Sequence, residues 1–328
     1  MKALKALLTG VALAGAFAAA QPDAAGAADY TLRLGSVLAP SDPLQVAAEG
    51  FKKAVEERSK GAMEVQLYPS SQLGDTQDMM DQAAAGANVG TFVEASRVSV
   101  FVPEFNVLVA PYAFNSVDEL ARFVESDTFA AWNGELREKS GLTLLSFNWY
   151  QGARQMLTKK PIATPADLSG VRVRTIGQPL WVETIGAMGA VATPLPWAEV
   201  YPSLQTGVLD GAEAQPAAIW GAKLYEVVSD ITLTSHIYLM SGLLVSDAWL
   251  QSLPAELRAI VEEEAKRWGA EALRANVEGE AKIYADIRGA GVKVTEIDTT
   301  PFRNAVKPVW DKMDLTALVA EVRKTLDN

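Results

Sequence analysis

The stretch Val171–Met188 reads VRVRTIGQPLWVETIGAM and decides the fold class. Arg172 and Arg174 alternate with valines, which predicts a strand over 171–175 with both arginines on one face. Residues 179–188 then predict a helix. A strand followed closely by a helix is the repeating unit of α/β domains.

The same alternation extends in both directions from this stretch. Strands are expected over 32–35, 64–68, 90–93 and 142–147, and helices over 46–59, 76–85 and 117–135. This pattern predicts α/β layers around mainly parallel strands. The longest helical pattern covers 254–288 and could approach about 50 Å, enough to cross two lobes. The alternative is a bend at Gly269 or Gly279.

Composition excludes several classes of function. The chain has 328 residues, and at roughly 100–200 residues per domain two domains are expected. It has no cysteine and one histidine, His236, so thiolate and multi-histidine metal sites are excluded. A net charge of −11, from 29 Lys+Arg and 40 Asp+Glu, argues against a nucleic-acid partner. We expect no metal site and no cofactor, and we interpret His236 as structural.

Residues 1–27 predict a secretory signal peptide. Lys2 and Lys5 precede an apolar run over 7–20, and Ala25-Gly26-Ala27 offers a small-x-small cleavage site. The alternative, a membrane anchor, needs about 20 apolar residues, and the run is too short. We therefore expect a cleaved, exported protein in the periplasm. Cleavage would change the net charge from −11 to −12, because two lysines and Asp23 are removed.

Arginines and aromatic residues gather in the middle of the chain. Arg174 on its strand and Arg154 after Tyr150-Gln151-Gly152-Ala153 are candidate anion ligands, because a guanidinium matches a carboxylate in a bidentate manner. The alternative is a surface arginine paired with Asp167. Four of the eight tryptophans lie in the same region and could wall a pocket or pack in a core: Trp149, Trp181, Trp197 and Trp220.

Glu94 ends the expected strand over 90–93. It could accept hydrogen bonds from a ligand, or it could simply pair with Arg97, three residues further along the chain.

Several segments, taken in order, resemble one family. They are Tyr68-Pro69-Ser70-Ser71-Gln72-Leu73-Gly74-Asp75, Phe92-Val93-Glu94-Ala95-Ser96, Ala110-Pro111-Tyr112, Asp167-Leu168-Ser169-Gly170-Val171-Arg172-Val173-Arg174, and Glu199-Val200-Tyr201 through Leu204-Gln205-Thr206-Gly207-Val208-Leu209-Asp210-Gly211 to Glu213. The set resembles the DctP-type solute-binding proteins of tripartite ATP-independent periplasmic (TRAP) transporters. The resemblance covers residues 31–310.

The resemblance implies a two-lobed, periplasmic-binding-protein-like α/β fold, with a ligand cleft between the lobes and a long helix that spans both. We expect lobe I to comprise 28–151 plus 240–280, and lobe II 152–239 plus 281–328. Arg154 and Arg174 should lie in one lobe and Glu94 in the other. The implied function is to capture a small organic anion, most often a carboxylate, and to deliver it to a small and a large membrane subunit. A monomer is the default.

The resemblance also assigns roles to individual residues. It implies that Arg174 forms the carboxylate salt bridge, with Arg154, Glu94 and Trp197 completing the pocket. Where the family usually carries Asn after Asp-Gly-x-Glu, this chain has Ala214-Gln215, so Gln215 could replace that amide. The full set of candidate ligand-binding residues is Arg174, Arg154, Glu94, Trp197, Gln215, Trp149 and Glu213.

Two other classes of function compete with this interpretation. An exported hydrolase could use Glu94 and Glu213 as an acid–base pair, although no Gly-x-Ser-x-Gly motif is present. A binding module could present its ligand to a sensor. The sequence leaves open whether the ligand is a mono- or dicarboxylate, a sugar acid, an aromatic acid or a sulfonate, and whether a cation assists.

Overall fold

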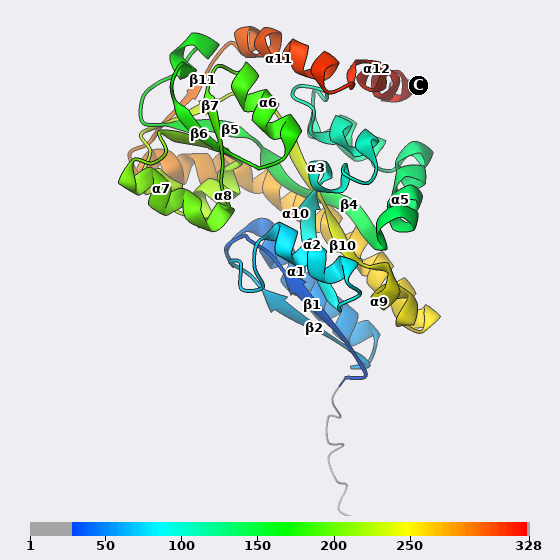
Figure 1. The fold of residues 1–328 in the computed structure, drawn as a ribbon. Helices are drawn as coiled ribbons and strands as arrows, with labels where there is room; N and C mark the ends of the chain where they lie inside the picture. Colours follow the sequence, from blue (N-terminus) through cyan, green and yellow to red (C-terminus); the bar gives the residue numbers. More distant parts are fainter. Residues whose placement is uncertain (1–27, 327–328) are drawn as a thin grey trace, which may run out of the picture.

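Two β-sheets organise residues 28–326, which are the residues that the computed structural model describes (Figure 1). The predicted signal peptide, 1–27, lies outside them. The first sheet has the order β2-β1-β3-β10-β4. Its strands are β2 Met63–Tyr68, β1 Tyr30–Gly35, β3 Val89–Glu94, β10 Tyr238–Ser246 and β4 Leu142–Ala153.

The second sheet has the order β11-β9-β5-β8-β6-β7. Its strands are β11 Lys293–Glu296, β9 Asp230–Leu233, β5 Gln155–Thr158, β8 Gly211–Ala214, β6 Arg172–Thr175 and β7 Val191–Pro194. Both sheets are mixed, whereas the sequence predicted mainly parallel strands. The antiparallel pairs all involve β10 or β5, which belong to the connections between the sheets.

Two stretches of backbone cross from one sheet to the other. Strand β4 leads through Arg154 into β5, and β9 leads through residues 234–237 into β10. The two crossings are joined, because the Arg154 N–H donates to the Ile237 carbonyl at 2.8 Å. Arg154 therefore lies at the junction of the two sheets.

The long helix predicted over 254–288 is α10, Ala255–Gly289. It packs against α1 and β4 on the side of the first sheet and against α8 and β11 on the side of the second. Its Gly269 allows β4 to approach closely, since a Cβ there would lie 2.0 Å from the Asn148 side-chain oxygen. The helix continues through both glycines. The fold is thus two-lobed with a long helix that spans both lobes, as expected.

The remaining helices cover the sheets and form the ends of the molecule. The predicted helix over 117–135 is two helices, because the Ser126 hydroxyl accepts from Phe129 N–H and starts a new helix there. The α-helices are α1 Pro43–Arg58, α2 Thr76–Ala84, α3 Ala95–Val98, α4 Val117–Phe123, α5 Asp127–Ser140, α6 Pro179–Ala187, α7 Val200–Thr206, α8 Pro216–Gly221, α9 Asp247–Ser252, α11 Thr300–Lys312 and α12 Thr316–Leu326. Short 3-10 helices cover Pro103–Val109, Pro165–Leu168, Trp197–Glu199 and Leu224–Glu226.

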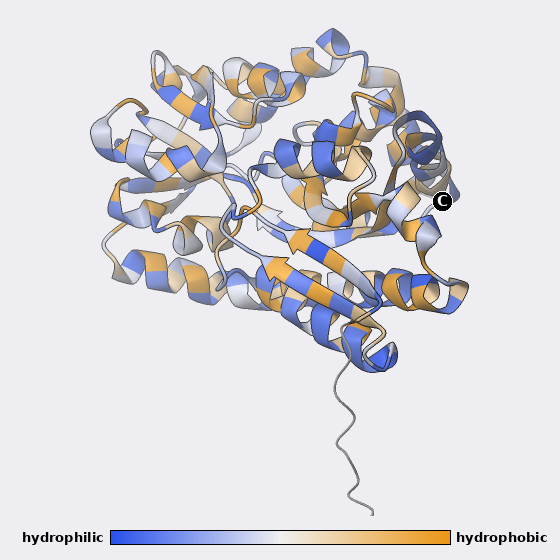
Figure 2. Ribbon diagram, turned by 60° about the horizontal axis from the view of Figure 1, so that its bottom comes forward, coloured by the Kyte–Doolittle hydropathy of each residue, from blue (hydrophilic) through white to orange (hydrophobic). Residues whose placement is uncertain are grey.

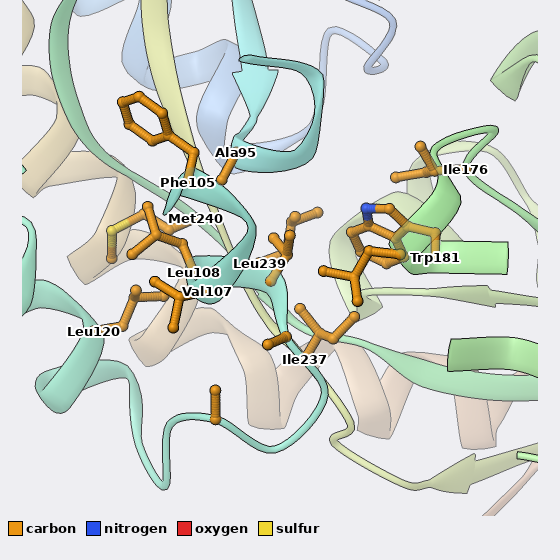
Figure 3. Packing of buried hydrophobic residues seen from close by; sticks show 14 of the residues in the cluster. Ala95, Phe105, Val107, Leu108, Leu120, Ile176, Trp181, Ile237, Leu239 and Met240 are labelled. Atoms are coloured by element: carbon orange, nitrogen blue, oxygen red, sulfur yellow. The ribbon is translucent and has the colours of Figure 1, made fainter. Parts of the chain in front are cut away.

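The largest hydrophobic cluster runs from one lobe into the other. Trp181 and Ile176, which follow β6, lie on one side of it and Phe105 and Met240 on the other, with Leu239 between them (Figure 3). Strands β1 and β2 alternate hydrophobic and hydrophilic residues along their length (Figure 2), and their buried residues contribute to a second cluster. Within residues 28–326, no helix is long and apolar enough to cross a membrane.

Candidate functional site

A cleft of about 320 Å³ opens between the two sheets. Five of the seven predicted ligand-binding residues line it, and they come from both lobes. Glu94 ends β3 of the first sheet, and Arg174 lies near the end of β6 of the second. The five residues are Glu94, Arg154, Arg174, Trp197 and Gln215.

Arg174 is buried in this cleft and is only 5 % exposed. Its Nε donates to the Leu195 carbonyl at 2.9 Å, and its guanidinium carbon lies 5.3 Å from the centre of the Trp197 ring. Burial lowers the pKa of Arg174 to about 10, so it remains protonated at neutral pH. Among residues 28–326, no carboxylate lies within ion-pair distance of its guanidinium. Within this part of the chain, Arg174 therefore has no direct ion-pair partner, although the carboxylates of Glu213 and Glu94 attract it from farther away.

Arg172, on the same strand, is bound differently. Its guanidinium is exposed and forms a bidentate ion pair with Asp210, with Nε at 2.7 Å and Nη2 at 2.9 Å from the carboxylate oxygens. The surface pairing that the sequence left open for an arginine of this strand thus applies to Arg172, with Asp210 as the partner.

The guanidinium of Arg154 is held from several sides. It is ion-paired with the carboxylate of Glu213, donates to the Glu213 carbonyl at 2.6 Å, and donates to Gln215 Oε1 at 2.8 Å. Its guanidinium carbon lies 5.0 Å from the centre of the Trp181 ring. Glu213 is fully buried, and its carboxylate neutralises the positive charge of Arg154.

His236 lies beside the same pair. Its Nε2 is 3.6 Å from Glu213 Oε2, and its Nδ1 is 2.9 Å from the Thr234 hydroxyl. Burial lowers the pKa of His236, so the ring is neutral near pH 7. Burial opposes ionisation of Glu213, but Arg154 and His236 outweigh it and hold the pKa of this carboxyl below its usual value. The Arg154–Glu213 pair is therefore charged, with zero net charge.

On the side of the first lobe, the two charged residues Glu94 and Arg97 line the cleft and neutralise each other. Arg97 Nε donates to Glu94 Oε2 at 2.6 Å, so the pairing that the sequence left open for Glu94 is present while both residues line the cleft. Asp75, at the rim, caps α2 by accepting from the backbone N–H groups of Gln77 and Asp78.

A chain of side-chain amides crosses the floor of the cleft. Gln215 Nε2 donates to Gln151 Oε1 at 2.8 Å, and Gln151 Nε2 donates to the Ser241 hydroxyl at 2.6 Å. Gln151 and Gln178 line the cleft but were not predicted. Gln151 lies three residues before Arg154 in the sequence, and this short spacing is the feature that could have indicated its place in the cleft.

Trp149 and Glu213 are the two predicted residues that do not line the cleft. Trp149 is fully buried, and its ring packs against Phe51 and Phe92 in the core below the first sheet. Glu213 does not reach the cleft itself, but it pairs with Arg154 and its charge also acts on Arg174. Within residues 28–326, no group of three His, Cys, Asp or Glu side chains is arranged to hold a metal ion.

Comparisons with known proteins agree on one family. The family model described as "Bacterial extracellular solute-binding protein, family 7" (DctP) matches residues 34–316. A TRAP periplasmic solute-binding protein from Escherichia fergusonii, in an apo open structure, is 43 % identical, with a TM-score of 0.79 over 90 % of this chain and 99 % of that one.

Two liganded structures are also similar. A TRAP periplasmic solute-binding protein from Ochrobacterium anthropi with bound L-fuconate is 27 % identical, with a TM-score of 0.88 over 91 % of this chain and 100 % of that one. A TRAP periplasmic solute-binding protein from Fusobacterium with bound sn-glycerol 3-phosphate is 28 % identical, with a TM-score of 0.86 over 91 % of this chain and 100 % of that one.

Proposed function

Because the chain belongs to the DctP family of bacterial extracellular solute-binding proteins, we propose that it captures a small organic monocarboxylate in the cleft between its lobes. Arg174 holds the carboxylate. The single observation that carries this proposal is that the buried guanidinium of Arg174 has no ion-pair partner among the described residues.

The charges that line the cleft support a ligand with one negative charge. Arg154 is neutralised by Glu213, and Arg97 by Glu94. Asp75, at the rim, is stabilised by the backbone N–H groups that it caps. Arg174 alone is left for the ligand. A buried charge is costly until it is paired, so one carboxylate relieves the cost and a second would be buried without a partner.

The polar groups around Arg174 suit a hydroxylated acid. Gln151, Gln178 and Gln215 present amides, and Glu94 presents a carboxylate that accepts hydrogen bonds from hydroxyl groups. Trp197 offers a ring face beside the guanidinium. A sugar acid of the kind bound by the Ochrobacterium protein fits this combination.

Lobe closure requires the ligand to contact both lobes, because a ligand shifts an equilibrium only by its differential affinity for the two states. Arg174 binds the carboxylate from lobe II, and Glu94 with Arg97 receives the other end from lobe I. We take lobe I as 28–151 plus 240–280 and lobe II as 152–239 plus 281–328. The exported protein, freed of residues 1–27, then delivers the acid to the membrane subunits of a TRAP transporter.

The test is a calorimetric titration of the purified protein with acids that differ in charge. The panel contains L-fuconate and D-glucuronate as monoacids, galactarate as a diacid, and sn-glycerol 3-phosphate. Ligand that co-purifies is first removed by reversible unfolding and is identified by mass spectrometry.

We expect at least one monoacid to bind at least tenfold more tightly than galactarate or sn-glycerol 3-phosphate. Arg174→Gln should weaken binding by several hundred-fold, because it leaves a buried carboxylate unpaired, which costs about 3–5 kcal/mol. Arg172→Gln removes the same charge from the same strand and should bind normally. Tighter binding of a dianion, or normal binding by Arg174→Gln, would overturn the proposal.

A further inference from the structure

A second cavity, of about 220 Å³, lies where α11 and α12 meet residues 111–112. It shares no residue with the cleft. Its lining residues are Pro111, Tyr112, Thr300, Arg303, Asn304, Val306, Lys307, Trp310 and Arg323. Figure 1 shows α11 and α12 following one another along the edge of the molecule, from the α6 side to the α5 side. We call this cavity the α11–α12 pocket.

The lining of the α11–α12 pocket includes three cations and no carboxylate. Arg303 Nε donates to the Thr299 hydroxyl at 3.2 Å, and Arg323 Nη2 donates to the Tyr112 carbonyl at 3.2 Å. Lys307 is exposed. Within residues 28–326, none of the three forms an ion pair with a carboxylate, although many other basic side chains of this acidic protein do. Three cations gathered around one cavity repel one another unless an anion lies between them.

The aromatic wall of this pocket is held firmly in place. Tyr112 is 5 % exposed and has a left-handed backbone, with φ of 56°. Its N–H donates to the His236 carbonyl and its hydroxyl to the Thr234 carbonyl, both at 2.9 Å. The guanidinium carbon of Arg303 lies 4.4 Å from the centre of the Tyr112 ring, which fixes one face of the guanidinium. Trp310 Nε1 donates to the Pro111 carbonyl at 3.1 Å and fixes another side of the pocket.

We propose that the α11–α12 pocket binds a small, multiply charged oxyanion, with inorganic phosphate or sulfate as its simplest form. The guanidinium forks of Arg303 and Arg323 match the oxygen geometry of such an ion, and Lys307 adds a mobile charge. The volume is below the roughly 300 Å³ at which pockets for larger ligands begin. The two proposed anion sites of this chain differ in the charge they offer: the cleft has one cation without an ion pair among the described residues, and the α11–α12 pocket has three.

The experiment titrates phosphate and sulfate into Arg174→Gln protein by calorimetry at constant ionic strength. This background removes the Arg174 charge from the cleft, so the result does not depend on the proposed function. Acetate is the monovalent comparison. We expect phosphate or sulfate to bind with a Kd below 1 mM, at least tenfold more tightly than acetate.

Variants then assign the site. Arg303→Gln with Lys307→Gln should weaken phosphate binding at least tenfold, whereas the matched pair Arg137→Gln with Lys293→Gln, both at exposed positions outside the pocket, should not. If the double variant fails to fold, Lys307→Gln alone, on the surface, should still weaken binding severalfold. Equal binding of acetate, or unchanged phosphate binding in the Lys307→Gln protein, would overturn the proposal.

Discussion

The indole nitrogen of Trp181 donates a hydrogen bond of 2.8 Å to the hydroxyl of Ser96, and both side chains are buried. Ser96 lies in α3, directly after the first sheet, whereas Trp181 lies in α6, after β6 of the second. The bond therefore ties the two lobes together beside the cleft. Since Arg154 lies over the Trp181 ring, it also fixes the surface on which that guanidinium rests.

Ser96→Ala should destabilise the protein by about 1–3 kcal/mol, because a buried indole N–H loses its acceptor. Urea unfolding followed by circular dichroism measures this free energy. Ser99→Ala is the control, since the Ser99 hydroxyl donates to a backbone carbonyl and its loss strands no buried side-chain donor. Equal stability of Ser96→Ala and wild-type protein would contradict the prediction.

Arg174→Gln should stabilise the protein in the absence of ligand, by about 1–3 kcal/mol, while it weakens binding. The reason is that the buried guanidinium has no carboxylate partner and its pKa is lowered to about 10 by burial. Arg172→Gln should instead lower the free energy of unfolding, by less than about 1 kcal/mol, because it breaks an exposed ion pair with Asp210. Urea unfolding of ligand-free protein at pH 7.5 compares the two. A loss of stability in Arg174→Gln would contradict the prediction.

Local patterns in the sequence were sufficient to predict the alternation of strands and helices and the long helix α10. They were not sufficient to predict which neighbouring strands run parallel and which antiparallel. Strand β10 pairs with both β3 and β4, and those partners lie far away in the chain. Antiparallel pairing of this kind depends on tertiary packing, which leaves no periodic signal in a single strand.

Some residues of the candidate site could be predicted from local sequence and others could not. The position of Arg174 in the cleft could be predicted, because its charge and its place on a strand are both local features. Trp149 could not be assigned correctly to pocket or core, because β4 is covered by α10 and α1 on the face where Trp149 points. Gln151 was missed because its role depends on Gln215 and Ser241, residues that only the fold brings near it.

The two glycines of α10 should respond in opposite ways to alanine. A Cβ at Gly279 meets nothing within 4 Å, so Gly279→Ala should stabilise the protein by about 0.5–1 kcal/mol through helix propensity. A Cβ at Gly269 would lie 2.0 Å from Asn148 Oδ1, so Gly269→Ala should destabilise the protein by about 1–3 kcal/mol. It would displace the Asn148 side chain, whose Nδ2 donates to the Lys266 carbonyl at 2.7 Å. Urea unfolding measures both free energies, and a change of the same sign in the two variants would contradict the prediction that Asn148 leaves no room for a side chain at Gly269.

Asp42→Asn should stabilise the protein at pH 8 more than at pH 5. Asp42 is buried at the N-terminus of α1, where one oxygen accepts from Leu44 N–H and the other has no partner among the described residues. Burial raises its pKa from 3.8 to about 7. Since the folded protein holds this proton more tightly than the unfolded chain, the stability that the carboxyl contributes is lost as the pH rises from about 4 through 7. Asn can still cap the helix and carries no charge, so this pH-dependent loss disappears. Unfolding free energies at the two pH values give the comparison, and an equal effect of the substitution at both would rule out a buried titrating carboxyl at this position.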